Sequence, residues 1–366
     1  MPATASGRVA AGTARPRQPA APLVPPPGPA RSPTPMGRRA GAALGLVALL
    51  CCSACGHASA GAAAVTCTGL GATVAASAPT AYPLTITDDA GRSVTIPAEP
   101  QRIVSLTLGT DEMLFALVDA SRVVAVTSLA SDPTSSFVAG QVGGLPGLSA
   151  NAEQVIALKP DLVFAASYTQ AGVISQLTSA GIPVVEFTTF CSLANVEAHV
   201  QTMGRILNAP AAATQLVAQM SSEVAKVRAA VAGQRRPRVV FYSDGYLYGT
   251  GTTIDEVIAD AGGTDAAAAA GFNQWTQVGP EEIVKLNPDV ILTDGATSDD
   301  ADQGGAAKAI LTDPVYRGVK AVRSGQVWEL SPRADSDVGQ YMAWDVQDVA
   351  AVLHPAQIQL FTPPAG

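Results

Sequence analysis

The chain has 366 residues, which is enough for about two domains. Hydrophobic residues make up 48% of it and charged residues only 14%, which indicates a sizeable core and excludes a chain that is disordered throughout. The formal net charge is −8, and the part of the chain after residue 54 carries −14, which disfavours nucleic acid and anionic membrane surfaces as partners.

Residues 1–35 contain mainly Pro, Ala, Gly and Arg, with no acid and almost no large apolar side chain. Such a segment cannot bury enough surface to offset its chain entropy, so we expect it to be disordered. The alternative is that this segment is upstream sequence and that the protein starts at Met36.

Residues 36–54 are expected to be a signal peptide. Two arginines precede an apolar run of 12 residues, which is too short to span a bilayer. Small residues and a cysteine follow, and this order resembles a bacterial lipoprotein signal, in which the cysteine is lipidated and becomes the new N-terminus. Cys55 is the predicted lipidation site, with Cys52 and Cys51 as alternatives. An anchor helix that is never cleaved is the other interpretation.

Removal of residues 1–54 makes the chain more acidic. That segment holds six of the 22 basic residues and none of the 30 acidic ones, so the remainder carries a net charge of −14. Export would place Cys67 and Cys191 in an oxidising compartment, where we expect them to form a disulfide. Closing so long a loop would stabilise the fold by about 4–5 kcal/mol. Two free thiols are the alternative.

Residues 55–82 are rich in Ala, Gly, Ser and Thr and are expected to be a flexible tether to the extracytoplasmic face of the cell membrane. An N-terminal lobe should follow over residues 83–208. It opens with two alternating runs around Ala90 and Gly91, which is a hairpin signal. We expect a short buried strand over 102–106 next. A helix over 110–120, with Thr110 as its N-cap, and a strand over 122–129 should follow.

The next predicted helix begins at Asn151, which can cap it, with Gln154 at the third helical position as in a capping box. Pro160 should end this helix, because the residue before a proline, Lys159, is pushed towards extended geometry. A buried strand over 161–167, a helix over 173–181 and a strand over 182–188 complete the lobe. Strands that alternate with helices indicate a mostly parallel sheet.

Residues 209–234 are expected to form one long connector helix. Pro210 suits its first position and Gly233 its stop. The apolar residues that recur at helical spacing are Leu216, Met220, Val224, Val227 and Val231. The helix has no glycine or proline inside, so we expect a stiff connector that lies against both neighbours.

The C-terminal lobe, residues 235–366, repeats the alternation. Strands are predicted over 237–245, 288–295 and 326–331, and helices over 253–263, 279–287 and 338–355. The segments around Tyr246 and Trp275 are expected to be loops. The predicted fold class is therefore α/β, with two Rossmann-like lobes that contain mostly parallel sheets and are joined by one long connector helix.

One phrase occurs in both lobes. The stretch NAEQVIALKPDLVF, residues 151–164, returns as GPEEIVKLNPDVIL, residues 279–292. Together with the stretch DDAGRSVTIPAEPQRIVSL, the connector and the lipoprotein signal, this repeat resembles the Fe/B12-type periplasmic binding proteins. These proteins deliver ferric siderophores, haem or cobalamin to ABC importers. The resemblance covers about residues 83–357.

The resemblance implies a role for Glu153 and Glu281, which occupy matching positions in the two copies. In such proteins one surface Glu per lobe docks into an arginine pocket on each half of the permease dimer. The local explanation is that an acid in the first turn of a helix interacts favourably with the helix dipole, by about 0.3–1 kcal/mol.

The resemblance also implies that an iron-siderophore or a corrinoid is held between the lobes, on loops at strand ends, by a protein that is monomeric and has no cofactor of its own. Aromatic rings and a guanidinium can stack on and clamp a large, rigid, anionic complex. The alternative is rings that keep their edges in the core and their polar tips in water. The candidate ligand-binding residues are Tyr168, Tyr246, Tyr248, Trp275 and Arg333.

Other functions have less support in the sequence. Only His57, His199 and His354 are available, which disfavours a zinc or manganese receptor and haem ligation through His, and leaves haem ligation through Tyr as an alternative. We expect no enzyme, because the chain lacks a G-x-S-x-G elbow and a His-x-x-x-His pair. A sensing or adhesion lipoprotein and an extracellular hydrolase are the remaining alternatives.

Overall fold

A computed structural model describes residues 79–149, 151–295, 305–331, 333 and 338–359. These residues belong to one compact unit. The predictions for residues 1–54, including lipidation of Cys55, and for the tether up to residue 78 lie outside the described part of the chain.

The N-terminal lobe contains the predicted hairpin and a parallel sheet. The hairpin pairs β1 (Leu84–Thr87) with β2 (Ser93–Ile96) in antiparallel register, and Gly91 takes a positive φ in its turn. The sheet has the order β5-β4-β3-β6-β7, and each neighbouring pair is parallel. Its strands are β3 (Ile103–Ser105), β4 (Val123–Thr127), β5 (Gly147–Leu148), β6 (Leu162–Ala166) and β7 (Val184–Phe187). The helices are α1 (Leu108–Leu117), α2 (Ala152–Ala157), α3 (Ala171–Ser179) and α4 (Leu193–Ile206), with short 3-10 turns at Ala120–Arg122 and Ser128–Ser131.

The start of α1 corrects the sequence prediction. The N-cap is Thr107, which has extended backbone, and not Thr110, which lies inside the helix. The Thr110 hydroxyl is instead buried in a cluster with the hydroxyls of Ser105 (2.6 Å) and Thr107 (2.7 Å). Helix α4 was not predicted from the sequence. Its N-cap is Ser192, whose side chain accepts a hydrogen bond from the Asn195 N–H.

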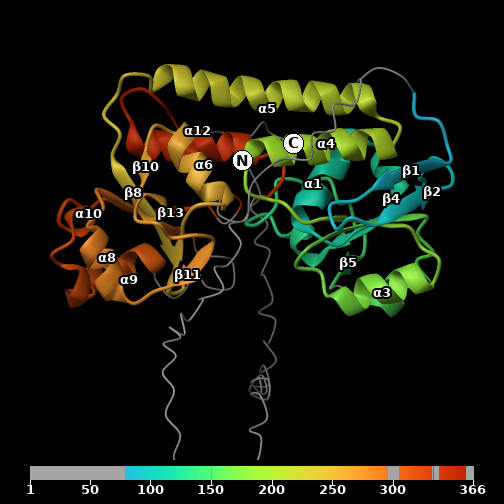
Figure 1. Ribbon diagram of the computed structural model, residues 1–366, viewed down its shortest axis with the longest axis horizontal. Coiled ribbons are helices and arrows are strands. Elements are labelled where there is room, and N and C mark those ends of the chain that lie inside the picture. Colours follow the sequence, from blue (N-terminus) through green and yellow to red (C-terminus); the bar gives the residue numbers. More distant parts are fainter. Residues whose placement is uncertain (1–78, 150, 296–304, 332, 334–337, 360–366) are drawn as a thin grey trace, which may run out of the picture. The chain divides into compact units, whose positions relative to one another are not determined.

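The connector is confirmed as α5 (Pro210–Ala230), with Pro210 at its first turn. Its 21 residues make a helix about 31 Å long. It packs against α4 and α1 of the N-terminal lobe and against α12 (Met342–Leu353) and α6 (Thr253–Asp260) of the C-terminal lobe. Figure 1 shows α5 running along one side of the described unit, with α4 and α12 beside it.

The sheet of the C-terminal lobe is mixed. Its path is β11-β9-β8-β12-β13, and β10 also pairs with β8. The contacts of β8 with β10 and β12, and of β12 with β13, are parallel, whereas β9 and β11 pair in antiparallel fashion. The strands are β8 (Arg238–Ser243), β9 (Tyr246–Tyr248), β10 (Thr264–Asp265), β11 (Trp275–Gln277), β12 (Val290–Asp294) and β13 (Val327–Leu330). The further helices are α7 (Ala266–Ala269), α8 (Pro280–Leu286), α9 (Ala306–Thr312) and α10 (Lys320–Arg323), with a 3-10 turn at Pro314–Tyr316.

The prediction of loops around Tyr246 and Trp275 is therefore wrong, because both segments are strands. The chain turns from β8 into β9 through Asp244 and Gly245, which have φ values of 49° and 80°. An Asp-Gly pair with two positive φ angles is the usual two-residue hairpin turn. This local signal was present in the sequence and predicts the antiparallel pairing.

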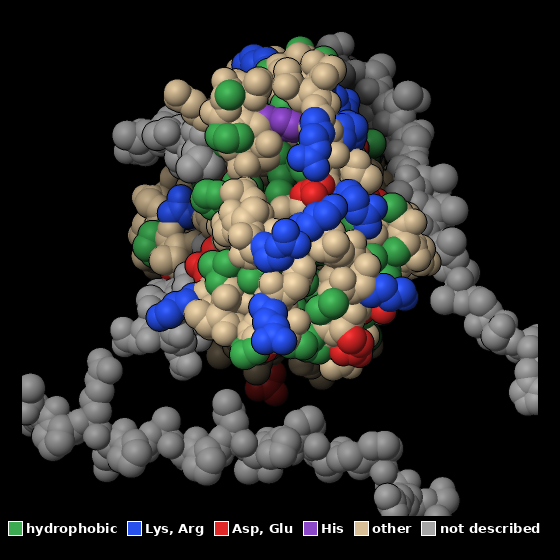
Figure 2. Space-filling model, turned by 90° about the vertical axis from the view of Figure 1, so that its left-hand side faces the viewer, with side chains coloured by type: hydrophobic (Ala, Val, Ile, Leu, Met, Phe, Trp, Pro, Cys, Tyr) green, Lys and Arg blue, Asp and Glu red, His purple; other side chains and the backbone are tan. Residues whose placement is uncertain are grey.

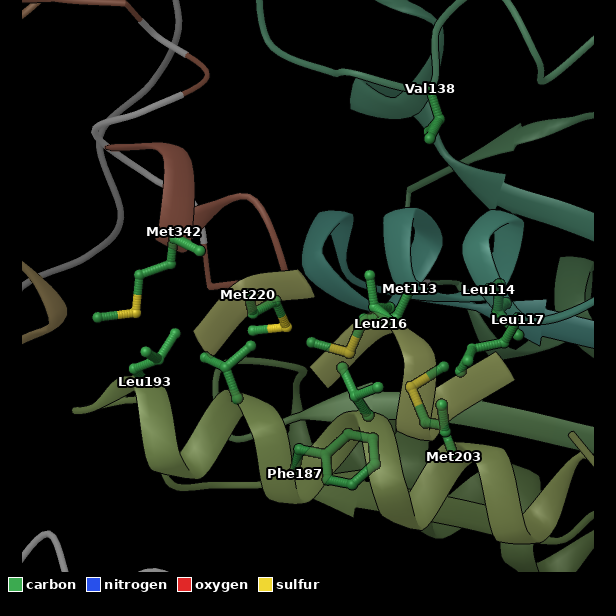
Figure 3. Packing of buried hydrophobic residues seen from close by; sticks show 14 of the residues in the cluster. Met113, Leu114, Leu117, Val138, Phe187, Leu193, Met203, Leu216, Met220 and Met342 are labelled. Carbon is green, nitrogen blue, oxygen red and sulfur yellow. The ribbon is translucent and has the colours of Figure 1, made fainter. Parts of the chain in front are cut away.

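The two lobes share one hydrophobic core. A single cluster runs from Met113 of α1 through Met203 of α4 and Met220 of α5 to Met342 of α12. In Figure 3 these side chains lie next to one another between the helices. Each lobe also has one further cluster of its own. Because interiors of this kind are close-packed, the shared cluster ties both lobes to the connector.

The repeated phrase forms the same unit in each lobe. A short helix, α2 or α8, leads into a buried parallel strand, β6 or β12. In both copies the residue before the proline has left-handed backbone: φ is 49° at Lys159 and 46° at Asn287. The extended geometry predicted for Lys159 is therefore wrong. A left-handed residue is a common way to end a helix, and it also avoids the right-handed helical region that a following proline disfavours.

The repeated Asp ties each unit to the start of a neighbouring strand in the sheet, β3 in the N-terminal lobe and β8 in the C-terminal lobe. The Asp161 carboxylate accepts hydrogen bonds from the N–H groups of Gln101 (2.8 Å) and Arg102 (2.9 Å). In the second copy, Asp289 accepts from the Arg238 N–H (3.0 Å). Each arginine in turn donates to the last carbonyls of the helix: Arg102 to Leu158 O (2.7 Å) and Arg238 to Leu286 O (3.2 Å). The repeated Pro-Asp pairs therefore have a structural role.

Candidate functional site

Glu153 and Glu281 occupy the same place in the two units. Each is the second residue of its helix, after the N-caps Asn151 and Gly279, and each is exposed. Asn151 accepts a hydrogen bond from the Gln154 N–H (3.1 Å), which confirms the predicted cap. The next acid in the second copy, Glu282, is half-buried and pairs with Lys285 (3.0 Å).

Gly279 leaves room for the Glu281 carboxylate. A Cβ atom built at residue 279 would overlap the carboxylate oxygens of Glu281. The side chain of Glu281 therefore folds over the start of α8, where the helix dipole favours a negative charge. A side chain at residue 279 would require this carboxylate to move away from the start of the helix.

Three of the predicted ligand-binding residues lie together on β9 and β11. Tyr248 is directly opposite Trp275 in the strand register, and their rings meet edge to face with centroids 6.3 Å apart. Trp275 is 58% exposed and Tyr246 is 40% exposed, whereas Tyr248 is half-buried against Phe241. These strands present an exposed aromatic surface at the carboxyl end of β8.

Tyr168 and Arg333 lie elsewhere. Tyr168 follows β6 in the N-terminal lobe, is 61% exposed and has its ring 6.3 Å from that of Phe190. The Arg333 guanidinium lies 5.2 Å from the centre of the Phe137 ring and donates to the carbonyl of Pro133, so this arginine of the C-terminal lobe contacts the N-terminal lobe.

Three residues that sequence reasoning missed complete this contact between the lobes. Phe137 stacks on Tyr341 with ring centroids 4.0 Å apart, and the Gln340 side chain donates to the Glu112 carbonyl (3.0 Å). No signal in the sequence could have identified them, because the pairing joins a loop of one lobe to the segment before α12 of the other.

Two carboxyl groups lie at the carboxyl ends of strands: Asp111 is buried beside the end of β4, and the half-buried Asp294 is the last residue of β12. Asp111 accepts hydrogen bonds from the Thr127 N–H (3.1 Å) and hydroxyl (2.6 Å), but burial dominates and raises its pKa to about 7. Burial and the nearby Asp244 raise the pKa of Asp294 to about 6, and the Ser243 hydroxyl donates to this carboxyl. These acids are therefore held partly protonated near neutral pH.

The two described histidines are both buried. His199 is 2% exposed, and its Nε2 lies 2.8 Å from Asp89; His354 is 6% exposed. In the part of the chain that the structure describes, no three His, Cys, Asp or Glu side chains gather as a metal site would require. None of the helices there is both long and apolar enough to cross a bilayer.

Cys191 is disulfide-bonded. It is the sole cysteine within the described ranges, so its partner lies outside them. The pairing with Cys67 stays a prediction.

Two cavities lie away from the predicted ligand-binding residues. One, of about 660 Å³, is between β2, β7 and α3. The other, of about 570 Å³, is at the amino ends of β8 and β12. Neither is lined by Tyr168, the β9–β11 aromatics or Arg333.

Comparison with known proteins gives consistent matches. Residues 103–334 match the family model described as periplasmic binding protein. A "Cobalamin-binding protein" of Halobacterium salinarum is 33% identical over 251 residues, which cover 67% of each chain. The "Uncharacterized ABC transporter substrate-binding lipoprotein YvrC" of Bacillus subtilis is 31% identical over 75% of this chain and 86% of its own. Among solved structures, the periplasmic heme-binding protein RhuT from Roseiflexus has a TM-score of 0.61 and 26% identity, over 70% of this chain and 99% of its own.

Proposed function

The chain belongs to the periplasmic binding protein family, and from this premise we propose that it is the extracytoplasmic substrate-binding lipoprotein of an ABC importer. It captures a cobalamin-like complex or a ferric siderophore between its lobes and hands it to the permease without chemistry. The relative named a cobalamin-binding protein supports the corrinoid, and the relative named a lipoprotein supports a lipid anchor, which we propose to be at Cys55.

The delivery role is supported by a difference between the polar residues of the repeated phrase: some have partners within their own lobe, whereas the two matching glutamates are exposed. The other repeated polar residues have partners inside their own lobe, since Asp161 and Asp289 hold strand starts. Glu153 and Glu281 are exposed at identical helix positions, one in each lobe. Two matching surface acids suit a two-fold permease with one basic pocket per subunit.

Charge reversal at both acids tests the delivery role. We expect Glu153→Lys with Glu281→Lys to abolish uptake of the bound chelate by cells and to leave ligand binding by the purified protein unchanged. The control is the same two-charge change at Glu197 and Glu223, on α4 and α5. Normal uptake by the Glu153/Glu281 variant would rule out docking through these residues.

Ligand capture is supported by the exposed aromatic surface of β9 and β11. Trp275 and Tyr246 are more exposed than is usual for large aromatic residues and face solvent beside the carboxyl end of β8. Rings in this position can stack on a corrin or on a siderophore complex.

Titration with cobalamins and ferric siderophores should quench the tryptophan fluorescence in a saturable way. We expect Trp275→Ala to lower the affinity by about tenfold, or about 1.4 kcal/mol. Absence of binding to every member of the panel would overturn capture of these ligands.

A haem ligand is the second candidate. The structural similarity to a heme-binding protein and the 61% exposure of Tyr168 favour it. Neither described His is accessible, so the axial ligand would be a tyrosine. A tyrosinate-type visible spectrum on haem titration that Tyr168→Phe removes would support this candidate against the corrinoid.

A further inference from the structure

The cavity of about 570 Å³ in the C-terminal lobe is separate from the proposed ligand site. It lies at the amino ends of β8 and β12, whereas the aromatic residues of β9 and β11 follow the carboxyl end of β8. It is closed on one side by α10 and on the other by the end of α12. It therefore opens on a different face of the lobe.

Cations dominate the lining of this cavity. Arg235, Lys320 and Arg323 contribute three positive charges, and Asp289 is the one carboxylate among the lining residues. All three cations are exposed, so their charged ends reach solvent and can move toward a ligand. Figure 2 shows Lys and Arg side chains gathered on this face of the lobe.

Asp289 is already engaged by several donors. It accepts from the Arg238 N–H (3.0 Å), lies 2.9 Å from the Arg235 guanidinium and lies 3.7 Å from the Lys320 ammonium. One carboxylate thus balances two cations in part, while Arg323 has no ion pair within the described ranges. The cavity keeps an excess of two positive charges.

Two more arginines beside the cavity raise the local potential. Arg236 donates to the carbonyls of Ala259 (3.0 Å) and Gly263, and Arg238 donates to the Leu286 carbonyl. Carbonyls satisfy these guanidinium groups but do not cancel their charge, and the Asp260 carboxylate offsets part of the charge of Arg236. In a chain whose net charge is −8, this concentration of cations in a concave surface is a local exception.

We propose that this cavity binds a phosphate-bearing anion. Guanidinium groups match the geometry of phosphate oxygens and lysine adds a mobile point charge, so Arg235, Arg323 and Lys320 can hold one phosphate group from three sides. The group can belong to a soluble phosphate compound or to a lipid headgroup, and both present the same oxygens. Anion binding in this cavity is independent of which ligand the protein transports.

The probes are pyrophosphate in calorimetry and phosphatidylcholine vesicles with or without phosphatidylglycerol in co-sedimentation. We expect saturable pyrophosphate binding that Arg235→Ala with Arg323→Ala weakens by about tenfold or more. The matched control is Lys308→Ala with Arg317→Ala, which removes two cations of the same lobe outside the cavity lining. These four side chains lie at the surface, and thermal melts check that both variants fold.

The vesicle measurement separates the two sources. Phosphatidylglycerol-dependent sedimentation that the Arg235/Arg323 variant loses, and that pyrophosphate inhibits, would assign the site to a lipid headgroup. Pyrophosphate binding without any vesicle effect would assign it to a soluble compound. Absence of saturable pyrophosphate binding, or an equal loss in the control variant, would overturn the proposal.

Discussion

Asp111 is a carboxylic acid with no exposed surface, and it precedes Glu112, whose carbonyl accepts a hydrogen bond from Gln340 of the other lobe. Its two hydrogen bonds from Thr127 favour the charged form, but burial outweighs them. Asp265, the N-cap of α7, has a pKa that burial likewise raises to about 7. Each of these groups keeps a proton in the folded protein that the unfolded chain releases above its ordinary pKa.

The resulting pH dependence has a definite sign. Because the folded pKa lies above the unfolded value of 3.8, the contribution of Asp111 to stability is complete below that value and is lost as the pH rises towards 7. We expect the free energy of unfolding to fall between pH 5 and pH 8. Asp111→Asn keeps an acceptor for Thr127 without a titrating proton, so its fall should be smaller by about 2–3 kcal/mol.

Urea denaturation at both pH values measures this difference. Asp119→Asn is the control, since Asp119 is exposed and hydrogen bonds lower its pKa. A fall as steep in Asp111→Asn as in the unaltered protein would show that Asp111 does not titrate in this range.

At the scale of elements, the repeated unit contains one acid that holds the fold together and one that lies at the surface. Asp161 accepts two backbone hydrogen bonds at the start of β3, whereas Glu153 is exposed. Asp161→Ala should therefore lower the free energy of unfolding by about 1–3 kcal/mol, and Glu153→Gln by less than about 1 kcal/mol. Equal losses in urea denaturation would mean that Glu153 acts mainly on its own helix.

The crossing of α4 and α5 depends on a glycine. A Cβ at Gly204 would overlap the Cβ of Ala213 on α5, and the Ala209 carbonyl lies 3.2 Å from the same point. Gly204→Ala should push the helices apart and lower the free energy of unfolding by about 1–3 kcal/mol, in spite of the better helix propensity of alanine.

Gly172 on α3 provides the matched control for this substitution. Nothing lies within 4 Å of a Cβ built there, so Gly172→Ala should be neutral or slightly stabilising. Thermal melts of the two variants compare them directly. A stable Gly204→Ala protein would mean that the two helices can separate without loss.

At the scale of the whole described unit, the shared core limits motion between the lobes. Helices α1, α4, α5 and α12 all contribute to one cluster, and α5 contains no glycine or proline after its first residue. Hinged closure needs a few residues that absorb a large backbone change, and the connector offers none. We therefore expect ligand to change the radius of gyration in small-angle scattering by less than about 1 Å. A contraction of several ångströms would show a hinge elsewhere.

The sequence alone determined the alternation of strands and helices, the connector and the repeated unit. These features depend on apolar periodicity and on local signals such as Pro210 at a helix start and Asn151 as a cap, which act within a few residues. The same local chemistry was available in Asp244-Gly245, where the antiparallel strands of the C-terminal lobe were missed.

Only the tertiary structure decided which distant side chains meet. It placed Phe137 on Tyr341, buried Asp111, and gathered Arg235, Lys320 and Arg323 in the lining of one cavity. It also showed that Asp161 and Asp289 are engaged internally and that Glu153 and Glu281 are exposed. Such pairings depend on how sheets and helices pack across long separations in the chain, and periodicity along the sequence carries no record of them.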